Sequence, residues 1–221
     1  MLGGFSLRLR GSDHEEHEEA TTKHTKDTKN YMIRGTAEKL KPRMKLLGGL
    51  LALMWAVFLV TALSGGALLS LGVIPRTAIG LRGILFAPFL HGSLAHIVAN
   101  SIPFFLLGWL VMLRDSGHFL PVTIFATLGS GLAAWLLGAS GSVHVGASGV
   151  IFGYLGFLIT AGWYERSVAS ILLSVVVIVL WGGMVFGVLP GQTGISWQAH
   201  LGGFIGGVLA ARMFRVPRQI G

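Results

Sequence analysis

Two residues in this sequence are suited to nucleophilic chemistry, although they lie far apart in the chain. Ser148 lies in the motif G-A-S-G, and His200 lies in the motif A-H-L-G-G-F-I-G-G. A serine hydroxyl becomes a strong nucleophile when a base removes its proton, and an imidazole can do this near neutral pH. The pair therefore indicates acyl transfer, with Ser148 as the nucleophile and His200 as the general base.

A carboxylate that orients the imidazole would be the usual third member of such a site, but none is available. Seven of the nine acidic residues lie between Asp13 and Glu38, and only Asp115 and Glu165 follow. Both of these lie at the far ends of apolar segments, away from the two motifs, so the sequence predicts a dyad. Paired aspartates and an H-E-x-x-H motif are also absent, which excludes the aspartate and zinc classes of protease. We expect no cofactor and no bound metal.

A second polar cluster lies in the stretch H-G-S-L-A-H-I-V-A-N, which contains His91, His96 and Asn100. His96 and Asn100 are four residues apart and share one face of a helix. Each can donate a hydrogen bond, and two donors aimed at one point can stabilise a tetrahedral oxyanion. Hydrogen bonding between helices is the alternative role for both. We expect His91 to brace the structure and His144 to be an ordinary polar loop residue.

Glycines at helical spacing predict how the two reactive residues are brought together. One glycine stripe begins at Gly149, directly after Ser148, and a second stripe at Gly203 and Gly207 follows His200. Helices approach one another closely along such stripes. The same stripes also serve packing alone, and a lone G-x-S-G motif is weak evidence for catalysis.

The elements that carry these motifs are apolar segments long enough to cross a bilayer, which requires about 20 residues. The chain is 52% hydrophobic and 12% charged, whereas soluble domains average about 25% charged residues. Segments exposed to lipid must be helical because their backbone groups need internal partners. The sequence therefore predicts an all-α, polytopic membrane protein with six transmembrane helices. The six segments are Leu46–Leu63, Ala95–Leu113, Leu120–Leu137, Ala147–Tyr164, Val168–Leu189 and Trp197–Phe214.

The distribution of basic residues predicts that both termini lie in the cytoplasm. Four basic residues lie between Lys39 and Lys45, directly before the first segment, and connections expected on the same side carry further arginines. In this orientation the second, fourth and sixth helices all run inward, so His96, Ser148 and His200 lie near the same outer surface. The net charge of +8 includes this membrane-flanking cluster. It does not indicate a nucleic-acid partner.

Three regions follow from this pattern. Residues 1–44 are expected to be a disordered cytoplasmic tail, 45–216 the membrane domain, and 217–221 a cytoplasmic C-terminal tail. The first tail is polar and lacks apolar periodicity, so its histidines are expected to be solvated and not to bind metal. The long first connection, roughly 64–94, mixes apolar and basic residues. This mixture predicts an interfacial segment, with a simple surface loop as the alternative.

The three motifs together resemble the rhomboid family of intramembrane serine proteases over residues 72–212. They occur in the order, and on the segments, typical of that family. The resemblance implies a six-helix rhomboid-like bundle in the cell membrane, with Ser148 as nucleophile and His200 as base. It also implies that His96, Asn100 and the Ser148 backbone N–H bind the oxyanion. A cavity that opens outward to water is implied, and single-span membrane proteins are the implied substrates, entering between the second and fifth helices.

Two departures from the family pattern concern the surroundings of this site. Phe152 stands where the family often has a tyrosine stacked on the catalytic histidine, and the first connection lacks the usual Trp-Arg pair. The residues expected to support the site are His91, Gly146, Gly149, Phe152, Gly203 and Gly207. The alternative is a non-catalytic relative that binds or escorts membrane clients, although such a protein typically loses the serine or the histidine. Oligomeric state and a specific substrate do not follow from the sequence.

Overall fold

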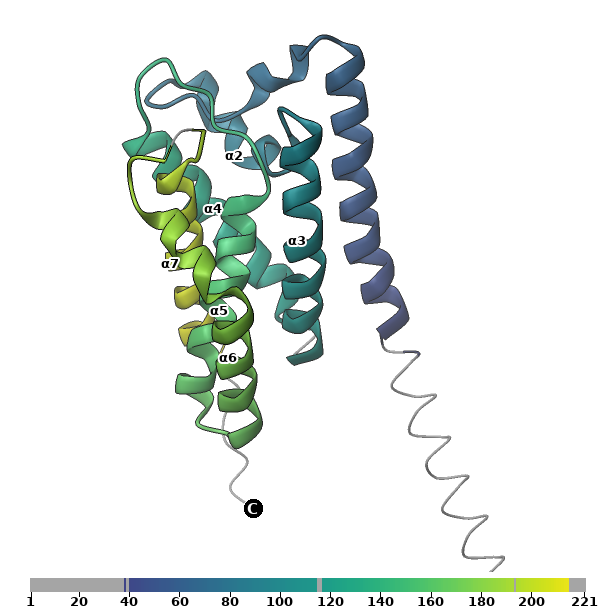
Figure 1. Cartoon of the computed structure of the whole chain (residues 1–221), viewed down its shortest axis with the longest axis vertical. Helices are drawn as coiled ribbons and strands as arrows, with labels where there is room; N and C mark the ends of the chain where they lie inside the picture. The colour runs from purple at the N-terminus through teal and green to yellow at the C-terminus, as the bar shows by residue number, and fades with distance from the viewer. Residues whose placement is uncertain (1–37, 39, 115–116, 193, 215–221) are drawn as a thin grey trace, which may run out of the picture. The chain divides into compact units, whose positions relative to one another are not determined.

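The structure, a computed structural model, describes residues 38, 40–114, 117–192 and 194–214. In these ranges it is built from helices, with one isolated bridge between Val73 and His144. The α-helices are Leu40–Leu63, α2 (Gly83–Phe86), α3 (Leu94–Arg114), α4 (Phe119–Leu137), α5 (Ser148–Glu165), α6 (Val168–Trp181) and α7 (Trp197–Met213) (Figure 1). The 3-10 helices are η1 (Ala67–Leu71), η2 (Ile79–Arg82), η3 (Ala87–Phe89) and η4 (Gly182–Val188). Most of the predicted N-terminal tail and all of 217–221 lie outside the described residues.

Four helices in the described part of the chain are long and apolar enough to cross a membrane. They are Leu40–Leu63, α3, α4 and Val168–Val188, the last of which joins α6 to η4. The predicted all-α, polytopic class is therefore confirmed. The first helix begins before the predicted start at Leu46. The other two predicted spans, α5 and α7, are rich in glycine. α5 is buried over most of its length, whereas α7 also has an exposed face that includes Ile205 and Leu209.

Glycines hold α7 against α5 at backbone contact. A Cβ added at Gly203 would overlap the carbonyl oxygen of Gly149, and one at Gly207 would overlap that of Gly153. The predicted contact between the two glycine stripes is therefore confirmed. Since the stripes lie directly below Ser148 and His200, this contact fixes the two residues at the same level.

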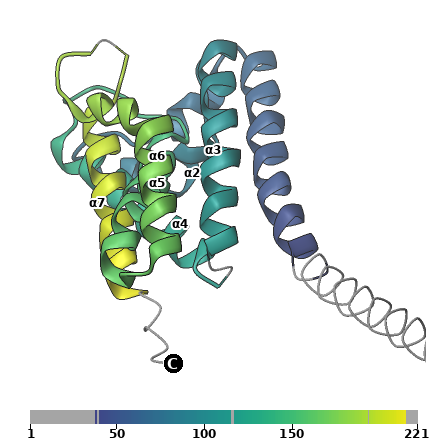
Figure 2. The same ribbon diagram turned by 60° about the horizontal axis from the view of Figure 1, so that its bottom comes forward.

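A second glycine face on α7, which the sequence did not predict, packs against α4. A Cβ added at Gly202 would overlap the carbonyl oxygen of Gly129, and one at Gly206 would overlap that of Phe125. Figure 2 shows α7 on the opposite side of the bundle from α3. The helix Leu40–Leu63 lies beside α3, where Trp55 Nε1 donates to Ser101 Oγ at 3.1 Å.

The long first connection is a series of short helical turns that packs against the end of α4. Arg76, whose φ is 56°, donates hydrogen bonds to the carbonyl oxygens of Leu136 at 3.1 Å and Gly138 at 2.8 Å. Trp135 Nε1 donates to the carbonyl oxygen of Thr77 at 2.8 Å. The segment is thus attached to the bundle and is not a free surface loop. Its predicted place at the lipid interface stays a prediction.

An ion pair joins three helices at the opposite end of the bundle from Ser148. Arg114 at the end of α3 binds Glu165 at the end of α5, with an N–O distance of 2.7 Å and side chains that are 5% and 11% exposed. Ser170 of α6 donates to the same carboxylate at 2.6 Å. Glu165, one of the two acidic residues that the sequence places away from the motifs, is therefore paired with Arg114 far from Ser148.

Candidate active site

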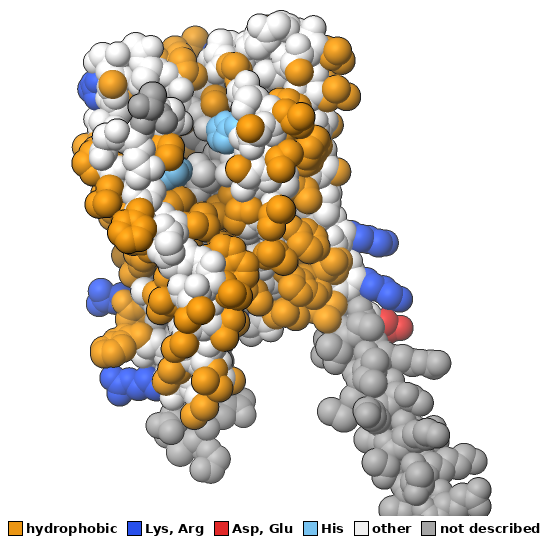
Figure 3. Space-filling model, viewed as in Figure 1, with side chains coloured by type: hydrophobic (Ala, Val, Ile, Leu, Met, Phe, Trp, Pro, Cys, Tyr) orange, Lys and Arg blue, Asp and Glu red, His pale blue; other side chains and the backbone are white. Residues whose placement is uncertain are grey.

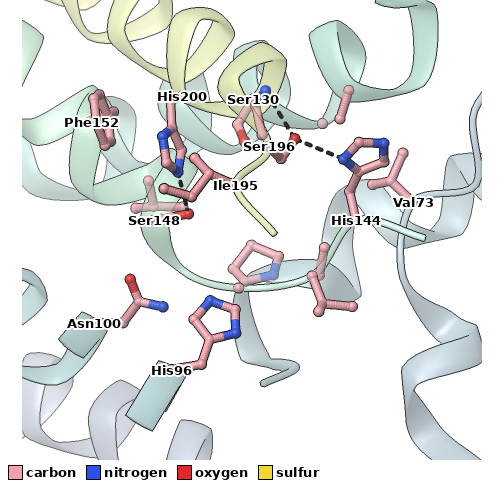
Figure 4. A pocket seen from close by; sticks show the side chains of 18 of the residues that line it. Val73, His96, Asn100, Ser130, His144, Ser148, Phe152, Ile195, Ser196 and His200 are labelled. Atoms are coloured by element: carbon pink, nitrogen blue, oxygen red, sulfur yellow. Dashed lines mark hydrogen bonds between the residues drawn. The ribbon is translucent and has the colours of Figure 1, made fainter. Parts of the chain in front are cut away.

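Ser148 and His200 meet at the first turns of two adjoining helices. Ser148 is the first residue of α5, and His200 lies in the first turn of α7. His200 Nε2 and Ser148 Oγ are 2.8 Å apart, which is hydrogen-bonding distance (Figure 4). The structure thus brings together the two residues that the sequence singled out.

A backbone carbonyl orients the His200 imidazole. Nδ1 lies 2.9 Å from the carbonyl oxygen of Gly187 in η4. A carbonyl can only accept, so Nδ1 carries the proton and Nε2 is left to accept from the Ser148 hydroxyl. Gly187 therefore takes the place that a carboxylate holds in a triad.

An aromatic ring fixes the plane of the same imidazole. Phe152, one helical turn after Ser148, stacks on His200 with ring centroids 4.1 Å apart and an interplanar angle of 11°. A Cβ at Gly187 would lie 2.8 Å from Phe152 Cζ and 3.1 Å from His200 Nδ1. Glycine is needed there because its backbone must approach both rings.

His96 and Asn100 converge from α3 on the loop that precedes Ser148. A Cβ added at Gly146, whose φ is +118°, would lie 2.6 Å from His96 Nε2 and 3.6 Å from Asn100 Nδ2. Asn100 is only 5% exposed, and its Nδ2 has no hydrogen-bond partner among the described residues. A buried donor without a partner is costly, so it points to an acceptor that arrives from outside the chain. In Figure 4, Ser148 lies between His200 and this pair.

His91 braces the same loop through a hydrogen bond to its backbone. It is fully buried, its Nδ1 donates to the Phe89 carbonyl, and its Nε2 accepts from the Ala147 N–H, each at 3.4 Å. Burial, followed by the nearby His96 ring, lowers the pKa of His91 from 6.5 to about 4. The neutral ring that this geometry requires is therefore the form present at pH 7.

A cavity of about 550 Å³ borders the paired residues. Its lining includes His96, Asn100, Ser148, Phe152 and His200. Figure 3 shows histidine side chains visible from outside where the surface is hollowed. Ser148 and His200 thus border the same space as His96 and Asn100 of α3.

The structure differs from the sequence analysis at His144, which was expected to be an ordinary polar loop residue. Its ring lies 2.9 Å from Ser142 Oγ and 2.7 Å from Ser196 Oγ, so it links two segments of the fold. The sequence analysis also missed Gly187, because it acts through its backbone carbonyl, a group that every residue has. No group of three metal-binding side chains occurs within the described residues. The histidines of the N-terminal tail lie outside that part.

Comparison with known proteins assigns the sequence to a family. A family model described as Rhomboid domain matches residues 79–216. An uncharacterized protein of Mycobacterium tuberculosis is 40% identical over 176 residues, covering 76% of this chain and 73% of that protein. The RHOMBOID-like protein 5 of Arabidopsis thaliana is 30% identical over 142 residues, 60% of this chain and 44% of that protein. The Rhomboid protease GluP of Bacillus subtilis is 30% identical over 135 residues, 58% of this chain and 25% of that protein.

Proposed function

The chain belongs to the rhomboid family, and we propose that it is a serine endopeptidase that cleaves single-span membrane proteins near the outer membrane surface. The observation that carries the proposal is the 2.8 Å hydrogen bond between Ser148 Oγ and His200 Nε2. A relative named as a rhomboid protease supports the same activity.

The proposed membrane arrangement has six transmembrane helices, with α5 and α7 added to the four that are long and apolar enough on their own. The lengths of α5 (18 residues) and α7 (17 residues) lie within the range of about 17–25 residues for a transmembrane helix. α5 is buried over most of its length, and the exposed side chains of α7 include the apolar Ile205 and Leu209. Residues 45–216 form the membrane domain, and residues 1–44 and 217–221 lie in the cytoplasm. The proposed location is the plasma or inner membrane, and the basic residues before the first helix favour a cytoplasmic N-terminus.

The reaction begins when His200 Nε2 accepts the Ser148 proton as Oγ attacks the scissile carbonyl carbon. The Gly187 carbonyl holds the Nδ1 proton throughout, and it stabilises the imidazolium that forms. His200 then gives its proton to the leaving amine, which releases the first product. A water molecule, deprotonated by His200 in turn, hydrolyses the acyl-enzyme and restores the Ser148 hydroxyl.

The oxyanion of each tetrahedral intermediate is proposed to bind the donors on the far side of Ser148 from His200. These donors are the side chains of His96 and Asn100, together with the Ser148 backbone N–H. The last of these lies at the start of α5, where a backbone N–H has no acceptor within its own helix. Donors fixed in advance around a developing charge contribute a large part of the rate enhancement in such sites. Asn100 Nδ2, which has no hydrogen-bond partner in the described part of the chain, supports this role.

Substrates are proposed to enter from the membrane between α3 and α6. The outward face of α6 is exposed along its length, including Val179 at 76% and Leu180 at 63%. Because Gly187 lies just beyond α6, this entry side also contains the group that orients His200.

The test is cleavage of a fluorescent single-span substrate by the detergent-purified protein. We expect Ser148→Ala and His200→Ala to abolish cleavage, since loss of either group from a serine protease site lowers kcat by about 10⁶-fold. Ser70→Ala is the matched control because Ser70 is an exposed serine outside the site, and it should cleave like the wild type. A fluorophosphonate probe should label the wild type and not Ser148→Ala.

Equal cleavage by the wild type and Ser148→Ala, or labelling of another serine, would contradict the proposal. Absence of cleavage and of labelling, with client binding retained, would instead support the non-catalytic alternative. Orientation is tested separately with a reporter fused after Gly221. This reporter should read as cytoplasmic, and an external reading would overturn the proposed topology.

A further inference from the structure

His144 occupies a position that relates it to both reactive residues. It lies four residues before Ser148, and its hydrogen-bond partner Ser196 lies four residues before His200. Ser196 is also the N-cap of α7, where its Oγ accepts from the Ala199 N–H at 3.3 Å. Its carbonyl oxygen accepts from the His200 N–H at 3.1 Å. A bond to Ser196 therefore acts on the turn of α7 that carries His200.

The hydrogen bonds around His144 have only one consistent direction when the ring is neutral. The Ser142 hydroxyl donates to the Ala139 carbonyl at 2.6 Å, so it must accept from His144 Nε2 at 2.9 Å. Nδ1 is then the acceptor of the ring, and the Ser196 hydroxyl donates to it at 2.7 Å. Burial lowers the pKa of His144, which favours this neutral form.

The loop side of the bond is also held in place. The backbone of His144 exchanges two hydrogen bonds with Val73 of the first connection, at 3.0 Å and 2.9 Å. Because the backbone of His144 is held in place, its side chain can hold Ser196 in place. By contrast, Ile195, which directly precedes Ser196, is 39% exposed. The start of α7 is thus held by the His144 contact and by Gln198 Nε2, which donates to the Leu137 carbonyl oxygen at 3.4 Å.

We propose that His144 is a positioning residue, whose Nδ1 bond to Ser196 sets the first turn of α7 so that His200 Nε2 stays within reach of Ser148 Oγ. Figure 4 shows the His144–Ser196 bond across the cavity from the dyad. The inference rests on the proposed function, because it assigns His144 to the same reaction without contact to the reacting atoms.

Two amide substitutions separate the halves of the His144 contact. In His144→Asn the amide oxygen replaces Nδ1 as acceptor for Ser196, and the bond to Ser142 is lost. In His144→Gln the amide nitrogen replaces Nε2 as donor to Ser142, and the bond to Ser196 is lost. His144→Ala loses both. The readouts are kcat and KM for the fluorescent substrate, the rate of fluorophosphonate labelling of Ser148, and the melting temperature in detergent.

We expect kcat to fall by up to about 100-fold in His144→Ala and His144→Gln, the loss that a displacement of about 1 Å in an active site can cause. KM should stay unchanged, and labelling should slow in parallel. His144→Asn should recover most of both rates, while its melting temperature stays close to that of His144→Gln. Equal activity in the two amide variants, or a loss that follows melting temperature alone, would overturn the positioning role and leave the dyad intact. An inactive wild type would overturn both proposals.

Discussion

The helices α6 and α7 both pack against α5, but they are held in different ways. Along α7, Gly203 and Gly207 bring its backbone against carbonyl oxygens of α5, and other glycines do the same against α4. Along α6, the buried side chains are Ser170, Ser174 and Val177. The polar attachments of α6 are thus confined to its first half, and in its far half Val177 is buried and Trp181 packs partly buried against the core.

This difference divides the proposed active site between a fixed part and a weakly held part. Ser148 and His200 lie on α5 and α7, the two helices in backbone contact. The carbonyl that orients His200 belongs to Gly187, in the 3-10 turn that follows α6. A substrate that displaces the end of α6 would therefore disturb the orientation of the base and leave its position unchanged.

The largest effect should come from filling the glycine contact of α7. Gly203→Val places side-chain atoms where the Gly149 carbonyl oxygen lies. Because the overlapped atom is backbone, the loss should exceed the roughly 1–3 kcal/mol typical of an overpacked core. We expect little folded protein by size-exclusion chromatography and no cleavage. Val179→Ala on α6 is the control, since this side chain is 76% exposed and its truncation should change melting little. Equal tolerance of both variants would show that α7 is no more fixed than α6.

A smaller loss should follow from breaking the ion pair at the base of α6. Arg114→Gln leaves the Glu165 carboxylate, which is 11% exposed, without its cation. Breaking a buried pair in this way costs about 3–5 kcal/mol of folding free energy. Replacing both partners by leucine should restore most of the stability, because no charge is then left buried. The measurement is the free energy of unfolding in mixed detergent micelles. A double leucine variant that is no more stable than Arg114→Gln would contradict the prediction.

The fixed part of this division could be read from the sequence, and much of the weakly held part could not. Spacing encodes which glycines share a helix face, so the contact of Gly203 and Gly207 with α5 followed from the pattern. The fifth predicted helix, Val168–Leu189, is in fact α6 followed by η4. Its α-helical part ends at Trp181, where Gly182 and Gly183 follow, and glycine has a low helix propensity.

In the site, too, the groups that act through side chains could be predicted from the sequence, and the group that acts through its backbone could not. Ser148, His200, His96 and Asn100 could be proposed because each residue type has its own chemistry. Gly187 could not, since any residue has a carbonyl and only the fold places this one beside His200. The link between His144 and Ser196 depends on a contact between distant loops, for which the sequence contains no periodic signal.

A third prediction concerns pH and the fixed part of the site, where His91 braces the start of α5. The unfolded chain takes up a proton on this ring below pH 6.5, whereas the folded chain does so only below about pH 4. The contribution of the neutral His91 ring to the free energy of unfolding is complete above pH 6.5. It is lost as the pH falls from 6.5 to about 4, by about 1.4 kcal/mol per pH unit at most. Melting temperatures should therefore fall between pH 7 and pH 4.5 by more in the wild type than in His91→Gln. An identical decline in both proteins would show that His91 is not the group responsible.

The smallest effect should come from Ser174, which ties the lower half of α6 to α5. Its hydroxyl donates to the Leu158 carbonyl oxygen at 2.7 Å and lies 3.0 Å from the carbonyl oxygen of Ser170. Ser174→Ala should cost about 1 kcal/mol, the usual net value of one hydrogen bond. Because the far half of α6 has few other attachments, that loss should appear as local opening. Hydrogen exchange should accelerate in α6 and η4 and stay unchanged in α7. The control is Thr160→Ala on α5, which removes only a hydrogen bond within its own helix. Faster exchange in α7 as well would mean that the two helices open as one unit, and the division between fixed and weakly held parts would then be wrong.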